Sequence, residues 1–355
     1  MKYYPISNTL FVKNRKHFIE NMSDNSVAFF NSNDCYPVSA DTTLPFEQHR
    51  DLFYLSGINQ EETVLLIYKN NNSNYEEILF LTKPNDLLTH WEGERLNKEK
   101  AFFISGIKTV YWLEQIDDII KKIMQNVNIL YLNKNEHYRA KVETETREKR
   151  FNNWIKKEYA SKDLKGCNSI LQKLRSVKDP IEIELIQKAC DITEKGFRRV
   201  LNFVKPGVWE YEIEAEFSHE FLRNRSKKFA YSPIIASGKN STILHYVENN
   251  NQCLDGDVLL LDVGAEYANY SSDMTRTIPV SGKFSKRQKS IYNSVLHVKN
   301  EATKLLKPGV IWKDHYNEVG KIMSSELLKL GLLSKSDVQN QTKENPAFKK
   351  YFTHG

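Results

Sequence analysis

The sequence predicts an α+β protein in two parts: a mixed α/β unit, then a domain in which helices flank an antiparallel sheet. Two observations predict this class. Short apolar runs alternate with helical spacing over roughly the first 150 residues. From residue 179 onward, the predicted order is helix, helix, strands, helix and helix. The length of 355 residues is enough for two ordinary domains or one large domain.

The first part contains four short apolar runs, each bounded by polar turn residues, as buried strands are. These runs are residues 27–30, 63–68, 77–81 and 128–132. Before the fourth run, residues 113–120 carry apolar side chains at helical spacing. A strongly charged segment, 144–157, follows. We therefore place the first domain at residues 1–160.

The second part begins with a helix at Asp179-Pro180, where proline occupies the first turn. Another amphipathic helix is predicted next, and then three strands and two more helices. The predicted ranges are 209–223 for that helix, 232–236, 258–267 and 270–279 for the strands, and 284–306 and 316–330 for the last helices. This order fits an antiparallel sheet covered on one face, and we place the second domain at 171–355.

The composition indicates a soluble protein of a reducing compartment. Mean hydropathy is −0.57, no apolar run approaches the roughly 18 residues of a membrane helix, and no secretory signal is visible. Four scattered cysteines contain no CxxC pair, which argues against a disulfide scaffold and a zinc ribbon. The net charge of +6 is mild and interspersed. We expect a cytoplasmic protein with neither a nucleic-acid nor a membrane partner.

The common motifs of several enzyme classes are missing. No two of the 14 glycines are spaced GxG, no GxSxG occurs, and residues 238–241 read GKNS, without Ser or Thr directly after the lysine. The residue four positions after His219 is Arg223, where a zinc-protease helix needs a second histidine. Hydride transfer, P-loop chemistry and serine hydrolysis therefore lack support from the sequence.

Two aspartates carry the chemistry that the sequence predicts. Asp262 interrupts an apolar strand, where an unpaired carboxylate is costly, and Asp273 follows 11 residues later on the expected return strand. If a two-residue loop joins the strands, both side chains point to the same face of the sheet. Their repulsion would be relieved by a divalent cation, provided that further ligands converge there.

Other interpretations of these residues remain open. One aspartate could cap a turn while the other pairs with Arg276, and a bulge or an odd loop would separate the two side chains. His245 also stands beside apolar residues, in the stretch 243–246. A lone histidine in such a place is more often a hydrogen-bonded core residue than a catalytic group.

Several stretches, taken in order, resemble the aminopeptidase P (Xaa-Pro aminopeptidase) family of pita-bread metallopeptidases. In the second half these are SPII at 232–235, ILHY at 243–246, GDVLLLDVGAEY at 256–267 and SDMTRTIPV at 272–280. Upstream, RSVKDPIEIE at 175–184 resembles the family's entry into its catalytic domain, and 46–57 and 91–96 resemble its amino-terminal domain. The resemblance implies a creatinase-type or aminopeptidase P-type amino-terminal domain followed by a pita-bread catalytic domain.

The resemblance also implies a metal centre of two divalent ions, usually manganese, with cobalt or zinc as alternatives. The aspartate matching Asp262 chelates one ion, and the one matching Asp273 bridges both. The histidine matching His245 contacts substrate and helps to stabilise the tetrahedral intermediate. In the family, a hydroxide shared by the ions attacks the scissile carbonyl of a peptide with proline at position two.

The last residues depart from the family's pattern. Residues 351–355, YFTHG, resemble the opening of a His-Gly-x-x-His segment, in which the first histidine faces substrate and the second binds metal. His354 then corresponds to the substrate-side histidine. The three remaining metal ligands of the family would follow Gly355. We therefore expect an incomplete catalytic domain, and we expect residues 1–355 alone to be inactive and poorly soluble.

Three functions compete on this fold. The leading one is an aminopeptidase acting before proline; the rivals are a prolidase that cleaves X-Pro dipeptides and a non-catalytic pita-bread binding protein. Methionine aminopeptidases do not need the amino-terminal domain, and creatinase-type chemistry needs no metal, so both fit these residues less well than the other three functions.

Trp91 resembles a family tryptophan that reaches toward a neighbouring subunit's active site and contacts substrate there. That role implies a homodimer or a higher homo-oligomer; the alternative is an ordinary packed aromatic.

Overall fold

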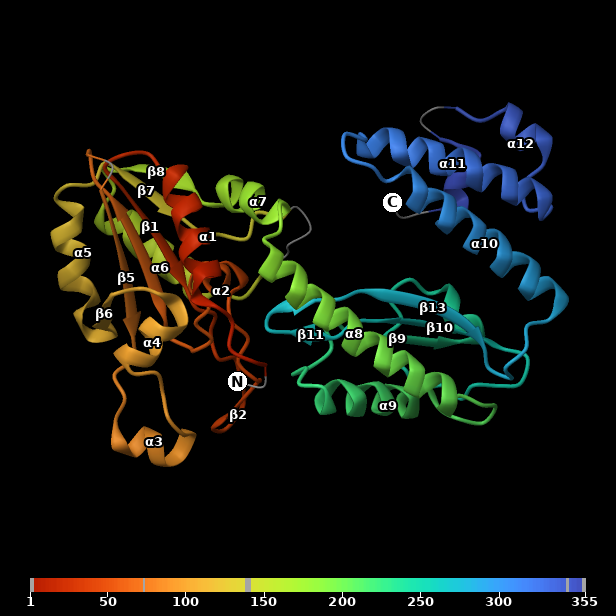
Figure 1. The fold of residues 1–355 in the computed structure, drawn as a ribbon, viewed down its shortest axis with the longest axis horizontal. Helices are drawn as coiled ribbons and strands as arrows, with labels where there is room; N and C mark the ends of the chain where they lie inside the picture. Colours follow the sequence, from red (N-terminus) through yellow and green to blue (C-terminus); the bar gives the residue numbers. More distant parts are fainter. Residues whose placement is uncertain (1–2, 73, 138–141, 343–344, 353–355) are drawn as a thin grey trace. The chain divides into compact units, whose positions relative to one another are not determined.

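The computed structural model describes residues 3–72, 74–137, 142–342 and 345–352, which divide into two compact units (Figure 1). Unit 1 comprises residues 1–191, 224–228 and 265–272, and unit 2 comprises 192–223, 229–264 and 273–355. Helix α8 (Pro180–Phe203) begins in unit 1 and ends in unit 2.

A six-stranded sheet in the order β6-β5-β4-β1-β7-β8 forms the centre of unit 1. Strand β1 is antiparallel to β4 and parallel to β7, and all its residues are buried because the sheet is covered on both faces. The four predicted runs correspond to β1, β4, β5 and β7. The strands are β1 (Ser26–Asn31), β4 (Val64–Lys69), β5 (Tyr75–Leu81), β6 (Thr109–Trp112), β7 (Ile129–Leu132) and β8 (Asp163–Gly166).

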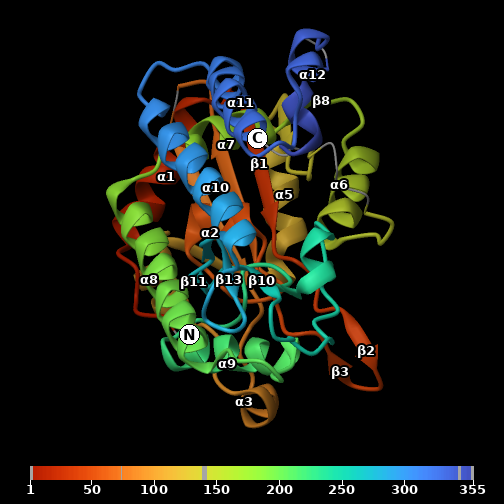
Figure 2. The ribbon, with the colours of Figure 1, turned by 90° about the vertical axis from the view of Figure 1, so that its right-hand side faces the viewer.

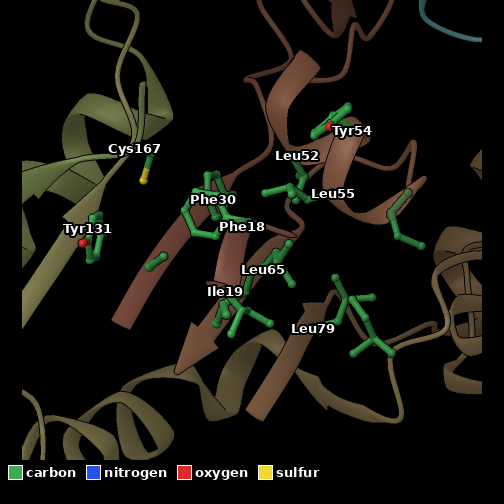
Figure 3. Close-up of a cluster of buried hydrophobic side chains, with 14 of the residues drawn as sticks. Phe18, Ile19, Phe30, Leu52, Tyr54, Leu55, Leu65, Leu79, Tyr131 and Cys167 are labelled. Atoms are coloured by element: carbon green, nitrogen blue, oxygen red, sulfur yellow. The ribbon is translucent and has the colours of Figure 1, made fainter. Parts of the chain in front are cut away.

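Helices cover both faces of this sheet (Figure 2). Successive residues of β1 point to opposite faces. Phe30 packs with residues of α1, α2, α4 and α7 (Figure 3), whereas Phe29 packs with residues of α5 and α6. The helices are α1 (Asn8–Glu20), α2 (Arg50–Ser56), α4 (Lys98–Ser105), α5 (Ile116–Met124), α6 (Arg147–Glu158) and α7 (Asn168–Ser176).

The charged segment after the first strands belongs to unit 1. It forms α6, which buries Ile155 against the sheet, while the side chain of Thr146 caps its first turn. Strand β8 then pairs with β7, and α7 follows it. The domain limits 1–160 and 171–355 stay a prediction. In this structure the region between them contributes a strand to the unit 1 sheet.

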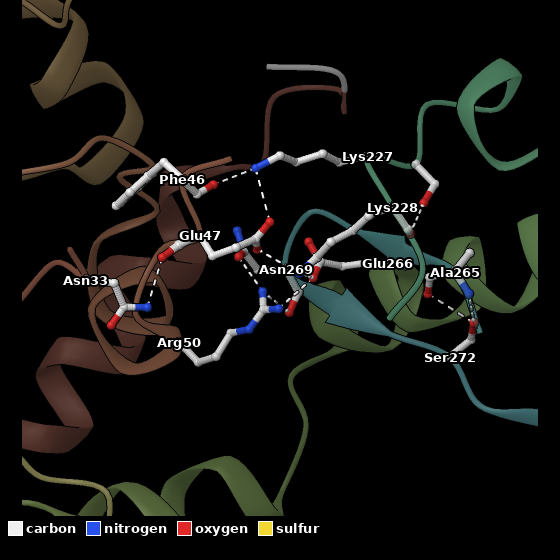
Figure 4. Close-up of polar contacts among 11 residues, drawn as sticks. Asn33, Phe46, Glu47, Arg50, Lys227, Lys228, Ala265, Glu266, Asn269 and Ser272 are labelled. Atoms are coloured by element: carbon white, nitrogen blue, oxygen red, sulfur yellow. Dashed lines mark hydrogen bonds and ion pairs between the residues drawn. The ribbon is translucent and has the colours of Figure 1, made fainter. Parts of the chain in front are cut away.

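Two segments from the second half of the chain complete unit 1. Residues 265–272 form a hairpin of β11 (Glu266–Tyr267) and β12 (Tyr270–Ser271). Its loop is Ala268 and Asn269, whose φ values of 53° and 65° suit a tight two-residue turn. Arg50 pairs with Glu266 at 2.5 Å, and Lys227 and Lys228 pair with Glu47 at 3.2 and 2.9 Å (Figure 4).

A three-stranded antiparallel sheet in the order β13-β10-β9 forms the centre of unit 2. Helix α9 (Glu210–Arg223) packs on β9 and buries Phe217 and Phe221. The ring of Phe217 also contacts that of Phe197 in α8. The predicted antiparallel sheet with helices on one face is confirmed. Its strands are β9 (Ile234–Ser237), β10 (Val258–Val263) and β13 (Met274–Pro279).

Helices α10 (Lys286–Leu305) and α11 (Trp312–Lys329) pack against each other after the sheet, followed by the short α12 (Lys335–Gln339). Both predicted helices are present, and the second starts earlier than predicted, at Trp312. Among the described residues, no helix is long and apolar enough to cross a membrane.

Candidate active site

The structure brings Asp262 and Asp273 to the same face of the unit 2 sheet. Every pair in the β10–β13 ladder joins an even-numbered residue of one strand to an odd-numbered residue of the other, as Asp262 with Thr275. Asp273 directly precedes β13 and keeps this alternation, so both carboxylates point the same way. The two-residue loop that the prediction required is present in the β11–β12 hairpin.

The hydroxyl of Tyr231 joins the two carboxylates. It lies 2.6 Å from Oδ1 of Asp262 and 3.1 Å from Oδ1 of Asp273, so its single proton can be donated to either. Burial raises the pKa of Tyr231 far above its usual value, and the hydrogen bond and charge of Asp262 add to the rise. The phenol therefore stays protonated and acts as a donor. No spacing pattern in the sequence pointed to Tyr231.

The face that carries the two aspartates is more open than the apolar sequence of β10 predicted. Burial alternates along the strand: Leu261 and Val263 are buried, whereas Asp262 is half-buried. Asp273 is exposed. Leu260, on the same face as Asp262, packs against a small cluster with Ile234, which explains the unbroken apolar run. The two carboxylates are thus accessible to a ligand.

This arrangement fits part of a site for a hard divalent cation. The Oδ1 atoms of Asp262 and Asp273 are separated by no more than the sum of their distances to Tyr231, and carboxylate oxygens suit such cations. Arg276, the alternative partner, donates instead to the carbonyl of Thr275 at 2.7 Å. In the described ranges, no group of three or more His, Cys, Asp or Glu could hold a metal ion. The described residues therefore supply two carboxylates to such a site, those of Asp262 and Asp273.

His245 lies exposed in a turn, contrary to the interpretation as a core residue. A buried carboxylate, that of Glu210, holds the loop that carries His245 in place. Glu210, fully buried at the start of α9, accepts hydrogen bonds from the Tyr246 hydroxyl at 2.7 Å, from Ser237 N at 2.7 Å and from Asn251 N at 2.9 Å. These contacts fix both ends of the loop. Sequence reasoning missed Glu210 because its partners are distant in sequence.

The two other predicted site residues are Trp91 and His354. Trp91 lies in α3 (Asp86–Glu92) of unit 1 and is 78% exposed, so it does not pack into the core of that unit. His354 lies outside the described residues.

Comparison with known proteins connects these observations. Residues 11–131 match the aminopeptidase P N-terminal domain, and residues 184–355 match metallopeptidase family M24. The chain is 32% identical over 352 residues to the Xaa-Pro aminopeptidase of Escherichia coli (strain K12), covering 99% of this chain and 79% of that protein. The chain belongs to the Xaa-Pro aminopeptidase family. The family resemblance inferred from the sequence is thereby confirmed.

Other relatives agree with this membership. The Xaa-Pro aminopeptidase of Haemophilus influenzae is 35% identical over 315 residues, covering 89% of this chain and 70% of that protein. A structure of a putative aminopeptidase P from Bacillus anthracis superposes with a TM-score of 0.88 at 31% identity, covering 94% of this chain and 80% of that chain. A structure of zinc-substituted E. coli aminopeptidase P in complex with product superposes with a TM-score of 0.84 at 29% identity, covering 93% of this chain and 76% of that chain. The fold is therefore that of the family, an aminopeptidase P N-terminal domain with a pita-bread domain.

Proposed function

We propose that this protein is a metallo-aminopeptidase that releases the N-terminal residue from peptides with proline at the second position. The observation that carries the proposal is the pair Asp262 and Asp273, which share the Tyr231 hydroxyl on one accessible face. This pair lies in the part of the chain that matches the M24 metallopeptidases. Relatives named Xaa-Pro aminopeptidase support the substrate class.

We propose Asp262 and Asp273 as ligands of two divalent ions. Manganese is our first choice, with cobalt or zinc as alternatives, because carboxylate oxygens are hard ligands. Bound ions would supply a water of lowered pKa and would polarise the scissile carbonyl. Tyr231 is a positioning residue in this proposal, because its hydroxyl orients both carboxylates.

The substrate-side roles fall to His245 and His354. His245 is exposed on a loop that Glu210 fixes, so its imidazole can donate a hydrogen bond to an oxygen that gains negative charge during the reaction. We propose the same side of the substrate for His354, from the family resemblance. We also propose that Trp91 contacts substrate in a neighbouring subunit, because its ring is largely exposed.

Peptide hydrolysis with manganese present, by the full-length protein that the family resemblance implies, tests the proposal. We expect release of the first residue from Gly-Pro-Ala and longer X-Pro peptides, and no release from Gly-Ala-Ala. Asp262→Asn should abolish the release with the fold intact by circular dichroism. Cleavage of the Gly-Pro dipeptide alone would favour a prolidase. A manganese-loaded protein that binds X-Pro peptides without cleaving them would favour a non-catalytic binding protein.

Two further properties are part of the proposal. An exposed Trp91 with a role in a neighbouring site implies a homodimer or a higher homo-oligomer, which light scattering at micromolar concentration would measure.

A cytoplasmic location is supported by the four free cysteines, Cys35, Cys167, Cys190 and Cys253. Fractionation of cells would locate the protein.

A further inference from the structure

A cluster of buried polar side chains lies at the carboxyl ends of two parallel strands in unit 1, far in sequence from the aspartate pair. Asn31 is the last residue of β1, Ser32 follows it, and Asn133 follows β7. Glu148 and Asn152 come from α6. Their exposed fractions are 0%, 1%, 1%, 7% and 6% in that order. Ligands of open α/β sheets commonly bind at this edge of parallel strands.

Hydrogen bonds join four of these residues in two groups, Asn31 with Glu148 and Asn152 with Asn133. Asn31 donates through Nδ2 to Oε1 of Glu148 at 2.8 Å and through its backbone N–H to Oε2 at 3.4 Å. Asn152, one helical turn after Glu148, donates through Nδ2 to the carbonyl of Asn133 at 2.7 Å. Asn133 in turn donates through Nδ2 to Asp51 at 3.0 Å. Each of the three amide groups therefore uses its nitrogen as a donor.

The side-chain oxygens of the three asparagines and of Ser32 have no hydrogen-bond partner among the described residues. Within the described chain, Oδ1 of Asn31, Asn133 and Asn152 and Oγ of Ser32 are buried without a hydrogen-bond partner. A buried acceptor without a partner destabilises the folded state, because it has given up its hydrogen bonds to water. These four oxygens belong to residues at one edge of the sheet, where a single bound species could be shared by several acceptors.

The charge of the cluster is also unbalanced. Asp51 is paired with Arg175 at 2.6 Å, whereas Glu148 receives only neutral donors from Asn31. Burial raises the pKa of Glu148 to about 8, because the ionised form is poorly solvated there. An ionised Glu148 leaves one negative charge to be compensated.

We propose that Asn31, Ser32, Asn133, Glu148 and Asn152 form a binding site for one alkali cation, Na⁺ or K⁺; we call it the β1–β7 edge site. Amide, hydroxyl and carboxylate oxygens are the ligands of hard cations. A single carboxylate balances one positive charge, which favours a monovalent over a divalent ion. The site contains no histidine or cysteine that would favour a softer metal. It is independent of the peptidase function, since its residues belong to unit 1.

Thermal unfolding at constant ionic strength tests the β1–β7 edge site. The protein is compared in NaCl, KCl and choline chloride at pH 9, where Glu148 is ionised, with a tetramethylammonium salt of EDTA to remove divalent ions. We expect a higher Tm in NaCl or KCl than in choline chloride, rising with the logarithm of cation concentration above the Kd. Glu148→Gln should remove this dependence, and Glu158→Gln, an exposed residue at the end of the same helix, should keep it.

A second measurement covers the case in which Glu148→Gln fails to fold. Crystals of the wild-type protein soaked in RbCl or thallium acetate should give an anomalous peak in contact with the side-chain oxygens of Asn31, Asn133 and Asn152. Equal Tm values in all three salts would overturn the proposal, as would a crystal with water molecules alone in the site. Stabilisation by Ca²⁺ but by neither alkali cation would contradict the monovalent assignment.

Discussion

Replacing Glu210 by glutamine tests how the loop that carries His245 is held. Glu210 is fully buried, and its two oxygens accept three hydrogen bonds, from Ser237 N, Asn251 N and the Tyr246 hydroxyl. Glutamine preserves the volume of the side chain. It replaces one acceptor oxygen by an NH₂ group, which faces a donor in either orientation.

The loss of stability follows from these contacts. In the better orientation the amide faces Ser237 N alone, and that buried donor loses its acceptor at a cost of about 1–3 kcal/mol. The bonds from Tyr246 and Asn251 become neutral, which removes about 1 kcal/mol more. We therefore expect Glu210→Gln to lower the free energy of unfolding by about 2–4 kcal/mol. Tyr246→Phe, which removes the hydroxyl that donates to Glu210 and accepts from Asn250 N, should lower it by about 1–2 kcal/mol.

Urea unfolding and peptide hydrolysis measure the two consequences. Besides the stability loss, we expect kcat/KM for an X-Pro peptide to fall about 10- to 100-fold, because the loop no longer holds His245 in one position. Glu248→Gln is the matched control: Glu248 is an exposed residue of the same loop, and its change should stay within about 0.5 kcal/mol. If Glu210→Gln is as stable and as active as Glu248→Gln, then Glu210 does not anchor the loop.

Three other substitutions probe separate features. Tyr231→Phe should weaken manganese binding about 10- to 100-fold in calorimetry because it frees both carboxylates, and an unchanged Kd would show that the hydroxyl does not orient them. Burial lowers the pKa of His49, which caps α2, so its neutral form is favoured on folding and stability should fall as pH drops below about 6.5. His49→Asn replaces the capping Nδ1 by a capping amide oxygen and should flatten this dependence by up to about 1.4 kcal/mol per pH unit; parallel curves would contradict it. Arg15→Met leaves the carboxylate of Glu77 without its 2.9 Å partner and should lower the unfolding free energy by about 2–4 kcal/mol, whereas adding Glu77→Leu should restore more than half; the idea fails if the double variant is the weaker one.

The alternation of residues along the chain allowed much of the site to be predicted. Once the loop has two residues, the residue numbers of Asp262 and Asp273 alone decide that their side chains point to the same face of the sheet. Helix α9 also follows from hydrophobic spacing, because it has one buried face, which contains Phe217 and Phe221.

Tertiary contacts explain what the sequence could not provide. Tyr231 and Glu210 act on residues 31 and 36 positions away, which no local pattern records. The openness of the Asp262 face was misjudged because Leu260 packs into a small local cluster, so an apolar run did not mean a fully buried strand. Likewise, the charged residues of 144–157 masked the apolar stripe of α6 that contains Ile155.

The carboxylate pair is tested most directly by diffraction from crystals grown with MnCl₂, with data collected at the manganese absorption edge. We predict anomalous peaks in contact with both Asp262 and Asp273, and their loss in Asp273→Asn. A map without manganese between the two carboxylates, from a protein that cleaves X-Pro peptides, would contradict the metal-ligand role of this pair.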